Sequence, residues 1–327
     1  MKELALAAFA AERGIHPRTE ARTARFAAFS TRFDARAYLE ALARQGLRWL
    51  GRSDRMFPPL LRAISDSPSG LFLRGTAPPE LLTRPAVAIV GARACSGYGA
   101  QVARMLGREL AAAGLVVVSG LARGVDGEAH RGALEAGGTT VAVLGCGVDR
   151  DYPAAHAELA GRIAASGLVV SEYAPGVEPA PWRFPARNRI VAGLAQATVV
   201  VEARERSGAL ITADFALEEG REVYACPGEI TSALSAGTNA LLRLGATPLT
   251  SSADVLELFG LEAAVEAEVA LDSPARAILE RLDGPTSADE LVRASGLDAG
   301  VAAAALSELE LAGLVATSDG VYRRTGR

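Results

Sequence analysis

From residue 86 onward the chain alternates short apolar runs with longer amphipathic stretches, and this alternation restricts the possible folds more than any other feature. The apolar runs are 86–90, 115–118, 139–144, 168–171, 198–201 and 222–225. Helix-like stretches separate them, at 98–113, 125–136, 153–165, 187–195 and 209–219. Strands that alternate with helices in this way form βαβ units. The sequence therefore predicts an α/β fold with a doubly wound parallel sheet.

Two segments of different character flank this region. Residues 1–50 contain short Ala- and Arg-rich stretches with apolar residues at helical spacing, which predict a small helical N-terminal domain. Residues 51–260 form the domain that holds the sheet. This domain begins with a proline-rich connector that contains one short strand. An Ala/Glu-rich linker follows at 261–271. Residues 272–327 predict three helices closed by a small hairpin, which is the winged-helix pattern.

Charge is distributed unevenly over the chain, whose net charge is −4. Residues 1–80 carry 13 basic and 8 acidic side chains, whereas residues 261–327 carry 6 basic and 12 acidic ones. The basic N-terminal segment either extends a path for nucleic acid or forms a solvated face. The acidic winged-helix domain carries Glu308 and Glu310, and no basic residue, on its last predicted helix, 301–312. Phosphates would repel such a helix, so we expect it to contact protein and not DNA.

Several functional classes are excluded by missing patterns. No uncharged apolar run approaches the length of a membrane span, and the first residues lack a signal-peptide layout, so we expect a cytoplasmic protein without membrane contact. Three scattered cysteines and three histidines exclude a disulfide framework and disfavour zinc. Arg93 stands where a dinucleotide-binding turn needs glycine, and no P-loop motif occurs. We therefore expect no metal and no cofactor.

Candidate binding residues follow the predicted strands, where open parallel sheets bind their ligands. Glycines there let backbone N–H groups approach an anion, and arginines add positive charge. The candidates after the strands, together with two residues that open a helix, are Gly91, Arg93, Ser96, Gly97, Ser119, Gly120, Arg123, Arg187, Asn188, Arg206 and Ser207. Such a rim suits the phosphates of a ligand larger than a dinucleotide.

Several of these motifs, in this order and spacing, resemble the DprA/Smf family of DNA-processing proteins. The resemblance covers about residues 50–260, and the winged-helix tail fits a common layout of that family. It rests on Gly91-Ala92-Arg93, Tyr98-Gly99, the run 119–126, Ala129-His130, Tyr152-Pro153, the run 184–189, the run 207–213 and Pro227-Gly228.

The resemblance implies a Rossmann-like domain that binds and protects single-stranded DNA in natural transformation and homologous recombination. It implies loading of a RecA-type recombinase, homodimerisation through the Rossmann-like domain, single-strand-binding protein as a further candidate partner, and a SAM-like N-terminal domain. The residues that it assigns to the phosphates of the strand are Arg93, Ser96, Ser119, Gly120, Arg123, Arg187 and Arg206. Two positions depart from the family. Arg206 replaces a frequent lysine and keeps its charge, whereas His156 replaces a frequent asparagine, so no role carries over to it.

Each charged candidate also has a structural interpretation. Arg93 either binds phosphate or pairs with Glu172 or Glu202, and we favour phosphate. Arg187 and Arg189 lie two residues apart, so they point differently on a helix, and we favour Arg187 for DNA and Arg189 for a carboxylate. We expect Glu172 and Glu202 to orient arginines and not to act as paired catalytic carboxylates.

Asp126 and His130 lie four residues apart and could form an acid–base pair or half of a metal site. We favour a helix-capping aspartate that holds the histidine.

Aromatic residues make up only 5% of the chain. Tyr98, Tyr152 and Trp182 are candidates for stacking on bases, whereas the apolar context of Phe184 predicts a core position. Binding that is dominated by phosphate contacts predicts little sequence preference and an affinity that depends strongly on salt.

Our preferred interpretation is a non-enzymatic protein that handles single-stranded DNA. The alternative is a Rossmann-like nucleotide phosphoribohydrolase, whose P-G-G-x-G-T turn is broken here at Pro227-Gly228-Glu229, with Gly237-Thr238 displaced downstream. A transcription regulator that reads duplex DNA through the winged helix is a third interpretation, and the acidic charge of that domain weakens it.

Overall fold

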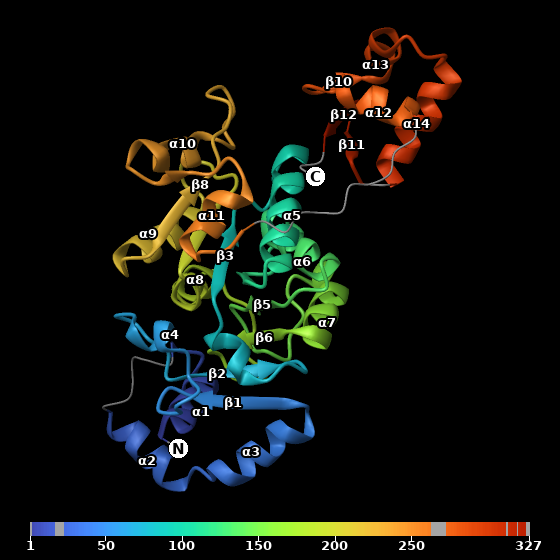
Figure 1. Cartoon of the computed structure of the whole chain (residues 1–327). Coiled ribbons are helices and arrows are strands. Elements are labelled where there is room, and N and C mark those ends of the chain that lie inside the picture. The colour runs from blue at the N-terminus through green and yellow to red at the C-terminus, as the bar shows by residue number, and fades with distance from the viewer. Residues whose placement is uncertain (1, 17–22, 263–272, 312, 319, 325–327) are drawn as a thin grey trace. The chain divides into compact units, whose positions relative to one another are not determined.

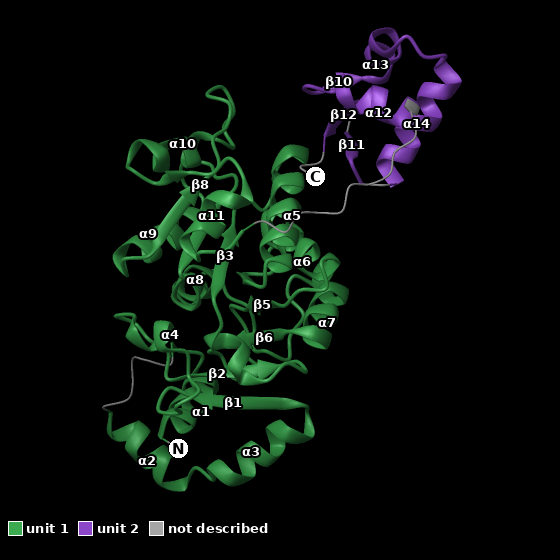
Figure 2. Ribbon diagram, viewed as in Figure 1, with its two compact units in different colours: residues 1–263 green, residues 264–327 purple. Residues whose placement is uncertain are grey.

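The computed structural model describes residues 2–16, 23–262, 273–311, 313–318 and 320–324. The chain forms two compact units, residues 1–263 and 264–327, drawn in different colours in Figure 2. Most of the predicted linker, 263–271, lies outside the described residues. Within the described ranges, no helix is long and apolar enough to cross a bilayer.

A nine-stranded sheet forms the centre of the first unit. Its spatial order is β1-β2-β6-β5-β4-β3-β7-β8-β9. The pairs from β6 to β9 are all parallel, whereas β1 and β2 add an antiparallel edge. The strands are β1 (Leu47–Gly51), β2 (Gly70–Arg74), β3 (Ala86–Val90), β4 (Val116–Ser119), β5 (Thr140–Val143), β6 (Leu168–Ser171), β7 (Ala197–Val200), β8 (Glu222–Ala225) and β9 (Thr247–Pro248). The predicted α/β fold with a parallel sheet is confirmed.

Helices cover both faces of this sheet, as its uninterrupted apolar strands require. Figure 1 shows α8 (Arg183–Leu194) and α9 (Gly208–Glu218) on one side of β3, and α5 (Gly97–Ala112) and α6 (Val125–Glu135) on the other. Alternate residues of β3 serve the two cores: Ala88 packs with Ile190 and Val191 of α8, and Ile89 packs with Leu106 of α5. This arrangement fixes the amino ends of α6 and α9 beside the carboxyl ends of the strands.

After β1, the remaining helices of this unit are shorter or lie at its edges. They are α4 (Pro59–Ala63), η1 (Pro79–Thr83), η2 (Ala154–His156), α7 (Ala157–Ser166), α10 (Ala236–Arg243) and α11 (Ser252–Leu258). Helix α8 begins at Arg183, four residues earlier than the sequence predicts, and this earlier start changes the surroundings of Phe184.

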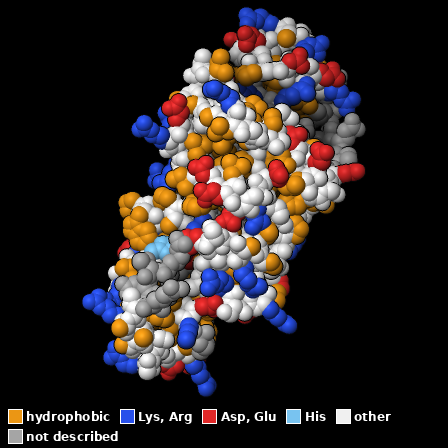
Figure 3. Space-filling view, turned by 90° about the vertical axis from the view of Figure 1, so that its left-hand side faces the viewer, with side chains coloured by type: hydrophobic (Ala, Val, Ile, Leu, Met, Phe, Trp, Pro, Cys, Tyr) orange, Lys and Arg blue, Asp and Glu red, His pale blue; other side chains and the backbone are white. Residues whose placement is uncertain are grey.

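The N-terminal segment belongs to the same compact unit as the sheet. It contains α1 (Lys2–Arg13), α2 (Ala24–Arg32) and α3 (Ala35–Arg44), and the expected boundary at residue 50 falls inside β1, which pairs with β2. Leu4 of α1 lies in one buried cluster with Phe72 of β2. Basic side chains gather at the lower end of the face shown in Figure 3, over these helices.

The second unit has the predicted winged-helix elements. Helices α12 (Ser273–Glu280), α13 (Ala288–Ser295) and α14 (Ala299–Leu311) precede the hairpin of β11 (Val315–Ser318) and β12 (Val321–Arg324), and β10 (Thr286–Ser287) completes a three-stranded sheet. Ile278, Leu291 and Leu309 join the three helices in a core of their own. Ser287 caps α13 through a reciprocal pair with Glu290.

Candidate functional site

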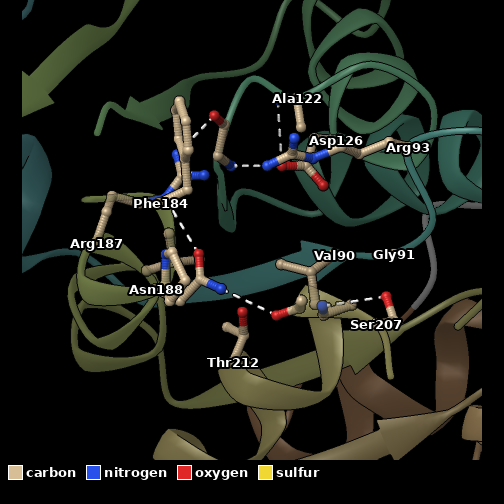
Figure 4. A pocket seen from close by; sticks show the side chains of 15 residues that line it. Val90, Gly91, Arg93, Ala122, Asp126, Phe184, Arg187, Asn188, Ser207 and Thr212 are labelled. Atoms are coloured by element: carbon tan, nitrogen blue, oxygen red, sulfur yellow. Dashed lines mark hydrogen bonds between the residues drawn. The ribbon is translucent and has the colours of Figure 1, made fainter. Parts of the chain in front are cut away.

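A cavity of about 240 Å³ lies beyond the carboxyl ends of β3 and β4. In the sheet, β3 lies between β4 and β7. The strand order reverses at β3, so the cavity lies at the topological switch point. Figure 4 shows residues of three origins facing one another across it. They are Val90 at the end of β3 with Gly91 and Arg93 after it, Gly120 and Ala122 after β4 with Asp126 of α6, and Phe184, Arg187, Asn188, Ser207 and Thr212 from α8 and the start of α9.

A second cavity, of about 360 Å³, adjoins the first. Both are lined by Arg93, Gly120, Ala122, Phe184 and Arg187. The second adds a more aromatic and basic wall, made of Leu144, Gly145, Arg123, Tyr152 and Pro153. We call the two together the double cavity. One half is rich in backbone and hydroxyl groups, and the other offers flat apolar surfaces.

Arg187 forms a buried, positively charged part of the wall between the two halves. Its side chain is 5% exposed, and its Nη1 donates to the carbonyl oxygens of Gly120, at 2.6 Å, and Val143. Its Nε donates to Asn188 Oδ1 at 3.2 Å. Burial lowers the pKa of Arg187, and the nearby Asp126 carboxylate opposes this effect. The backbone thus holds this guanidinium in place.

Arg189 takes the carboxylate that the sequence predicts for it. Its Nη1 and Nη2 each donate to Glu172 at 2.7 Å, and its Nε lies 2.9 Å from Asp66 Oδ2. Burial would raise the pKa of Glu172, but Arg189 and His16 outweigh it and bring the pKa to about 2. The prediction that Glu172 orients an arginine is confirmed, and Arg189 is a structural residue outside the double cavity.

Among the residues that the structure describes, Glu202 orients no arginine, so this expectation is wrong. Its carboxylate accepts from the Ser96 backbone N–H at 2.8 Å and from the Ser96 hydroxyl at 2.5 Å. The reason is local: Ser96 is the N-cap of α5, and the carboxylate satisfies donors at that helix end. Within the described part of the chain, neither Glu172 nor Glu202 forms an ion pair with Arg93. The guanidinium of Arg93 lies instead 5.3 Å from the centre of the Phe184 ring.

Phe184 is not a core residue, contrary to the prediction. It is partly exposed and lines both halves of the double cavity. The earlier start of α8 places it in the first turn of the helix, beyond the carboxyl ends of the central strands. Its ring stacks on Tyr152, with 5.2 Å between centres and 23° between planes. Arg93, Phe184 and Tyr152 therefore form a row that combines positive charge with aromatic surface.

The structure brings some of the sequence candidates together and separates others. Gly91, Arg93, Gly120, Arg187, Asn188 and Ser207 line the first half, and Arg123 lines the second. Four candidates lie elsewhere. Ser96 and Gly97 begin α5, Arg206 lines a neighbouring groove, and Ser119 is fully buried with its hydroxyl donating to Ile89 at 2.6 Å.

Asp126 and His130 do not hold each other. Asp126 Oδ2 accepts from the backbone N–H groups of Gly120, at 3.1 Å, and Ala122, at 3.3 Å. His130 Nδ1 lies 2.7 Å from Thr140 Oγ1, whose hydrogen is donated to Val117. Burial lowers the pKa of His130 to about 3, so its ring is neutral. Asp126 therefore braces a loop of the double cavity, and the predicted contact between aspartate and histidine is wrong.

Sequence reasoning also gave no role to His156, which is buried against the same loop. Its Nδ1 lies 3.0 Å from the carbonyl oxygen of Leu121. No periodic pattern or motif marks this contact, because the two residues lie 35 positions apart.

The double cavity has the properties of a site for an anion attached to a flat ring. Arginines supply charge, the amino ends of α6 and α9 supply partial positive charge, and Phe184 and Tyr152 supply stacking surface. Asp126 is the one carboxylate among the residues that line it. Burial raises the pKa of Asp126, and Arg187 opposes this effect.

Two family models match the chain. The model described as DNA recombination-mediator protein A covers residues 48–260, and the DprA winged helix domain covers residues 262–320. The protein Smf of Escherichia coli K12 is 39% identical over 285 residues, which cover 83% of this chain and 75% of that protein.

Solved structures give the same result. The crystal structure of DNA processing protein A from Streptococcus pneumoniae superposes with a TM-score of 0.66 and 40% identity, covering 78% of this chain and 92% of that one. DNA processing protein A from Helicobacter pylori, described for its unique single-stranded DNA binding mode, gives a TM-score of 0.57 and 32% identity, covering 62% and 92%.

Proposed function

Because this chain belongs to the DprA/Smf family of DNA-processing proteins, we propose that it binds single-stranded DNA in the double cavity. The observation that carries this proposal is the row of Arg93, Phe184 and Tyr152 above buried Arg187. A related protein of known structure, from Helicobacter pylori, is described as binding single-stranded DNA. The row offers a guanidinium for a phosphate and aromatic surface for a base.

The division of the double cavity suggests how a strand is held. The first half, with Gly91, Ser207 and the amino end of α9, suits a phosphate. The second half, with Phe184 and Tyr152, suits a base that has left its stack. Stacking accepts any base, so we expect little sequence preference. A duplex keeps its bases paired, so we expect it to bind less tightly.

We further propose that the protein protects incoming strands and loads a RecA-type recombinase onto them in natural transformation, acting in the cytoplasm. Membership of the family supports this proposal. Single-strand-binding protein is a further candidate partner. The acidic α14, with Glu308 and Glu310 and no basic residue, supports contact of the winged-helix unit with protein and not with DNA.

We also propose that the first unit forms a homodimer. A groove of about 410 Å³ lies between α9 and α10, where Leu210, Ile211, Leu241 and Leu244 form an apolar part and Glu205, Arg206 and Asp214 a charged one. Leu244 is 84% exposed beside this groove, so a partner that covered the groove would bury it together with the other leucines. Light scattering on the purified protein measures its mass in solution and tests this proposal.

The proposed role is non-catalytic, and one experiment separates it from the nucleotide-hydrolase alternative. Fluorescence anisotropy compares a labelled single strand with a duplex of equal length, and chromatography follows release of free base from nucleoside monophosphates. We expect tight binding of the single strand and no release of base. Release of base without preference for single strands would contradict the proposal. Pro227 to Glu229, where a hydrolase would carry its glycine-rich turn, line neither half of the double cavity.

A further inference from the structure

The loop Gly120–Gly124 forms one wall of the double cavity, and its backbone is held from several directions. The Asp126 carboxylate accepts hydrogen bonds from the backbone N–H groups of Gly120 and Ala122, and Arg187 donates to the Gly120 carbonyl. The loop supplies Gly120 and Ala122 to both halves and Arg123 to the second half. Any change in the path of this loop therefore moves several groups of the proposed DNA site together.

Leu121 lies at the centre of this loop in a strained conformation. Its φ is +60°, and no other non-glycine residue that the structure describes has a positive φ. Its side chain is fully buried. A side chain with a Cβ atom adopts this region only when its surroundings enforce it. The contacts of Leu121 therefore identify what holds the loop.

His156 makes the polar contact that holds Leu121. Its Nδ1 lies 3.0 Å from the Leu121 carbonyl oxygen, and because a carbonyl only accepts, Nδ1 carries the hydrogen and donates. The ring is 6% exposed and lies against Gly127, where a Cβ would be 2.7 Å from Cε1 of the histidine. The ring thus has little room to turn, and its donor is aimed at the loop.

We propose that His156 is a positioning residue of the DNA site. Its Nδ1–H holds the Leu121 carbonyl, keeps Leu121 in the left-handed region, and so fixes the backbone of Gly120 and Ala122 and the direction of Arg123. His156 does not itself line either half of the double cavity. This inference rests on the proposed function, which makes the double cavity the DNA site.

Chemical similarity provides a sharp pair of variants. In asparagine the amide nitrogen is attached to Cγ, as Nδ1 is in histidine, so His156→Asn keeps a donor at the same place. His156→Leu fills similar space without a donor. If the hydrogen bond matters, the asparagine variant behaves as wild type and the leucine variant does not. If only packing matters, the order is reversed.

The first measurement is hydrogen exchange of the full chain over residues 119–126, which requires no DNA. We expect faster exchange of the Gly120 and Ala122 amides in His156→Leu and wild-type exchange in His156→Asn. The second is the Kd for a labelled oligothymidylate. We expect about a tenfold rise for His156→Leu, the size of one lost hydrogen bond, and a change within about threefold for His156→Asn. In His156→Leu, a slope of log K against log salt that is less negative by about 0.7 would report the lost phosphate contact of Arg123.

Other outcomes overturn the proposal. Unchanged exchange in a folded His156→Leu variant shows that the bond does not hold the loop, and unchanged affinity despite faster exchange shows that the loop is not needed. If His156→Leu does not fold, His156→Ala takes its place. Should wild type fail to bind oligothymidylate, the proposed function fails, whereas the exchange data still decide whether His156 holds the loop.

Discussion

The guanidinium of Arg187 lies directly against the backbone of Gly120. Nη1 donates to the Gly120 carbonyl at 2.6 Å, and a Cβ on residue 120 would stand 2.5 Å from Nη2. A charged group is thus held in a buried position by the backbone of a loop that has no space for a side chain there. This contact joins α8 to the loop after β4, the two elements that meet at the double cavity.

Replacing Gly120 by alanine breaks this contact. We expect Gly120→Ala to lower the free energy of unfolding by about 1–3 kcal/mol, because the buried guanidinium cannot withdraw from the new methyl group without losing its hydrogen bonds. Denaturant unfolding measures the change. Gly161→Ala is the control: no atom lies within 4 Å of its new Cβ on α7, and we expect it to gain about 0.5–1 kcal/mol. Equal stability of the two variants would refute this account of Gly120.

The buried ion pair of Arg189 and Glu172 predicts a second stability effect. Arg189→Met leaves the carboxylate of Glu172, 2% exposed, without its main partner, and we expect a loss of about 3–5 kcal/mol. Arg36→Met is the matched control, because the Arg36–Glu40 pair is exposed and its loss changes the free energy of unfolding little. Similar losses in both variants would contradict the assignment of Arg189 as a buried structural residue.

His130 predicts how stability depends on pH. Burial lowers the pKa of His130 from 6.5 to about 3, so the folded protein excludes a proton that the unfolded chain binds. Stability is therefore present above pH 6.5 and falls as the pH drops below it, by about 2 kcal/mol at pH 5. Unfolding at several pH values measures the slope. His130→Asn, which cannot titrate, should flatten it, and an unchanged slope would show that other groups cause the loss.

Variants of Phe184 and Tyr98 show whether DNA binding depends on aromatic residues of the double cavity or on any exposed aromatic residue. We expect Phe184→Leu to weaken binding of a single strand by about 1–3 kcal/mol, because it removes the ring that lines both halves and on which Arg93 and Tyr152 pack. Tyr98 is 45% exposed but lines neither half, so Tyr98→Leu should leave the Kd unchanged. Anisotropy titration at constant salt compares the two. A larger effect at Tyr98 would move the DNA site away from the double cavity.

Much of the fold could be predicted because its signal is local. The strands at Ala86–Val90 and Glu222–Ala225 were predicted to the residue, since apolar runs between turn residues mark buried strands. Strand β1 was missed, because its place at the sheet edge depends on pairing with β2 and not on its own pattern. For Phe184, too, the local pattern is insufficient, because its apolar neighbours resemble a core until the start of α8 is known.

The site could be predicted as a set of glycines and arginines but not as a geometry. Arg93, Gly120 and Arg187 follow from the turns after the strands, whereas the contact of His156 with Leu121 joins distant parts of the chain. The sequence marked His156 as a departure from asparagine. The structure supplies a physical reason why the two are compatible, since both side chains carry a nitrogen donor on Cγ.

The most direct test of the DNA site is the salt dependence of single-strand binding. With four or five phosphate contacts, the slope of log K against log salt should be about −3, since each contact contributes about −0.7. Arg93→Ala and Arg123→Ala should each make it less negative by about 0.7. Arg84→Ala, at the opposite end of β3, where it donates to Gly114, should leave it unchanged. Slopes that do not respond to Arg93 and Arg123, or tighter binding of a duplex of equal length, would contradict the double cavity as the DNA site.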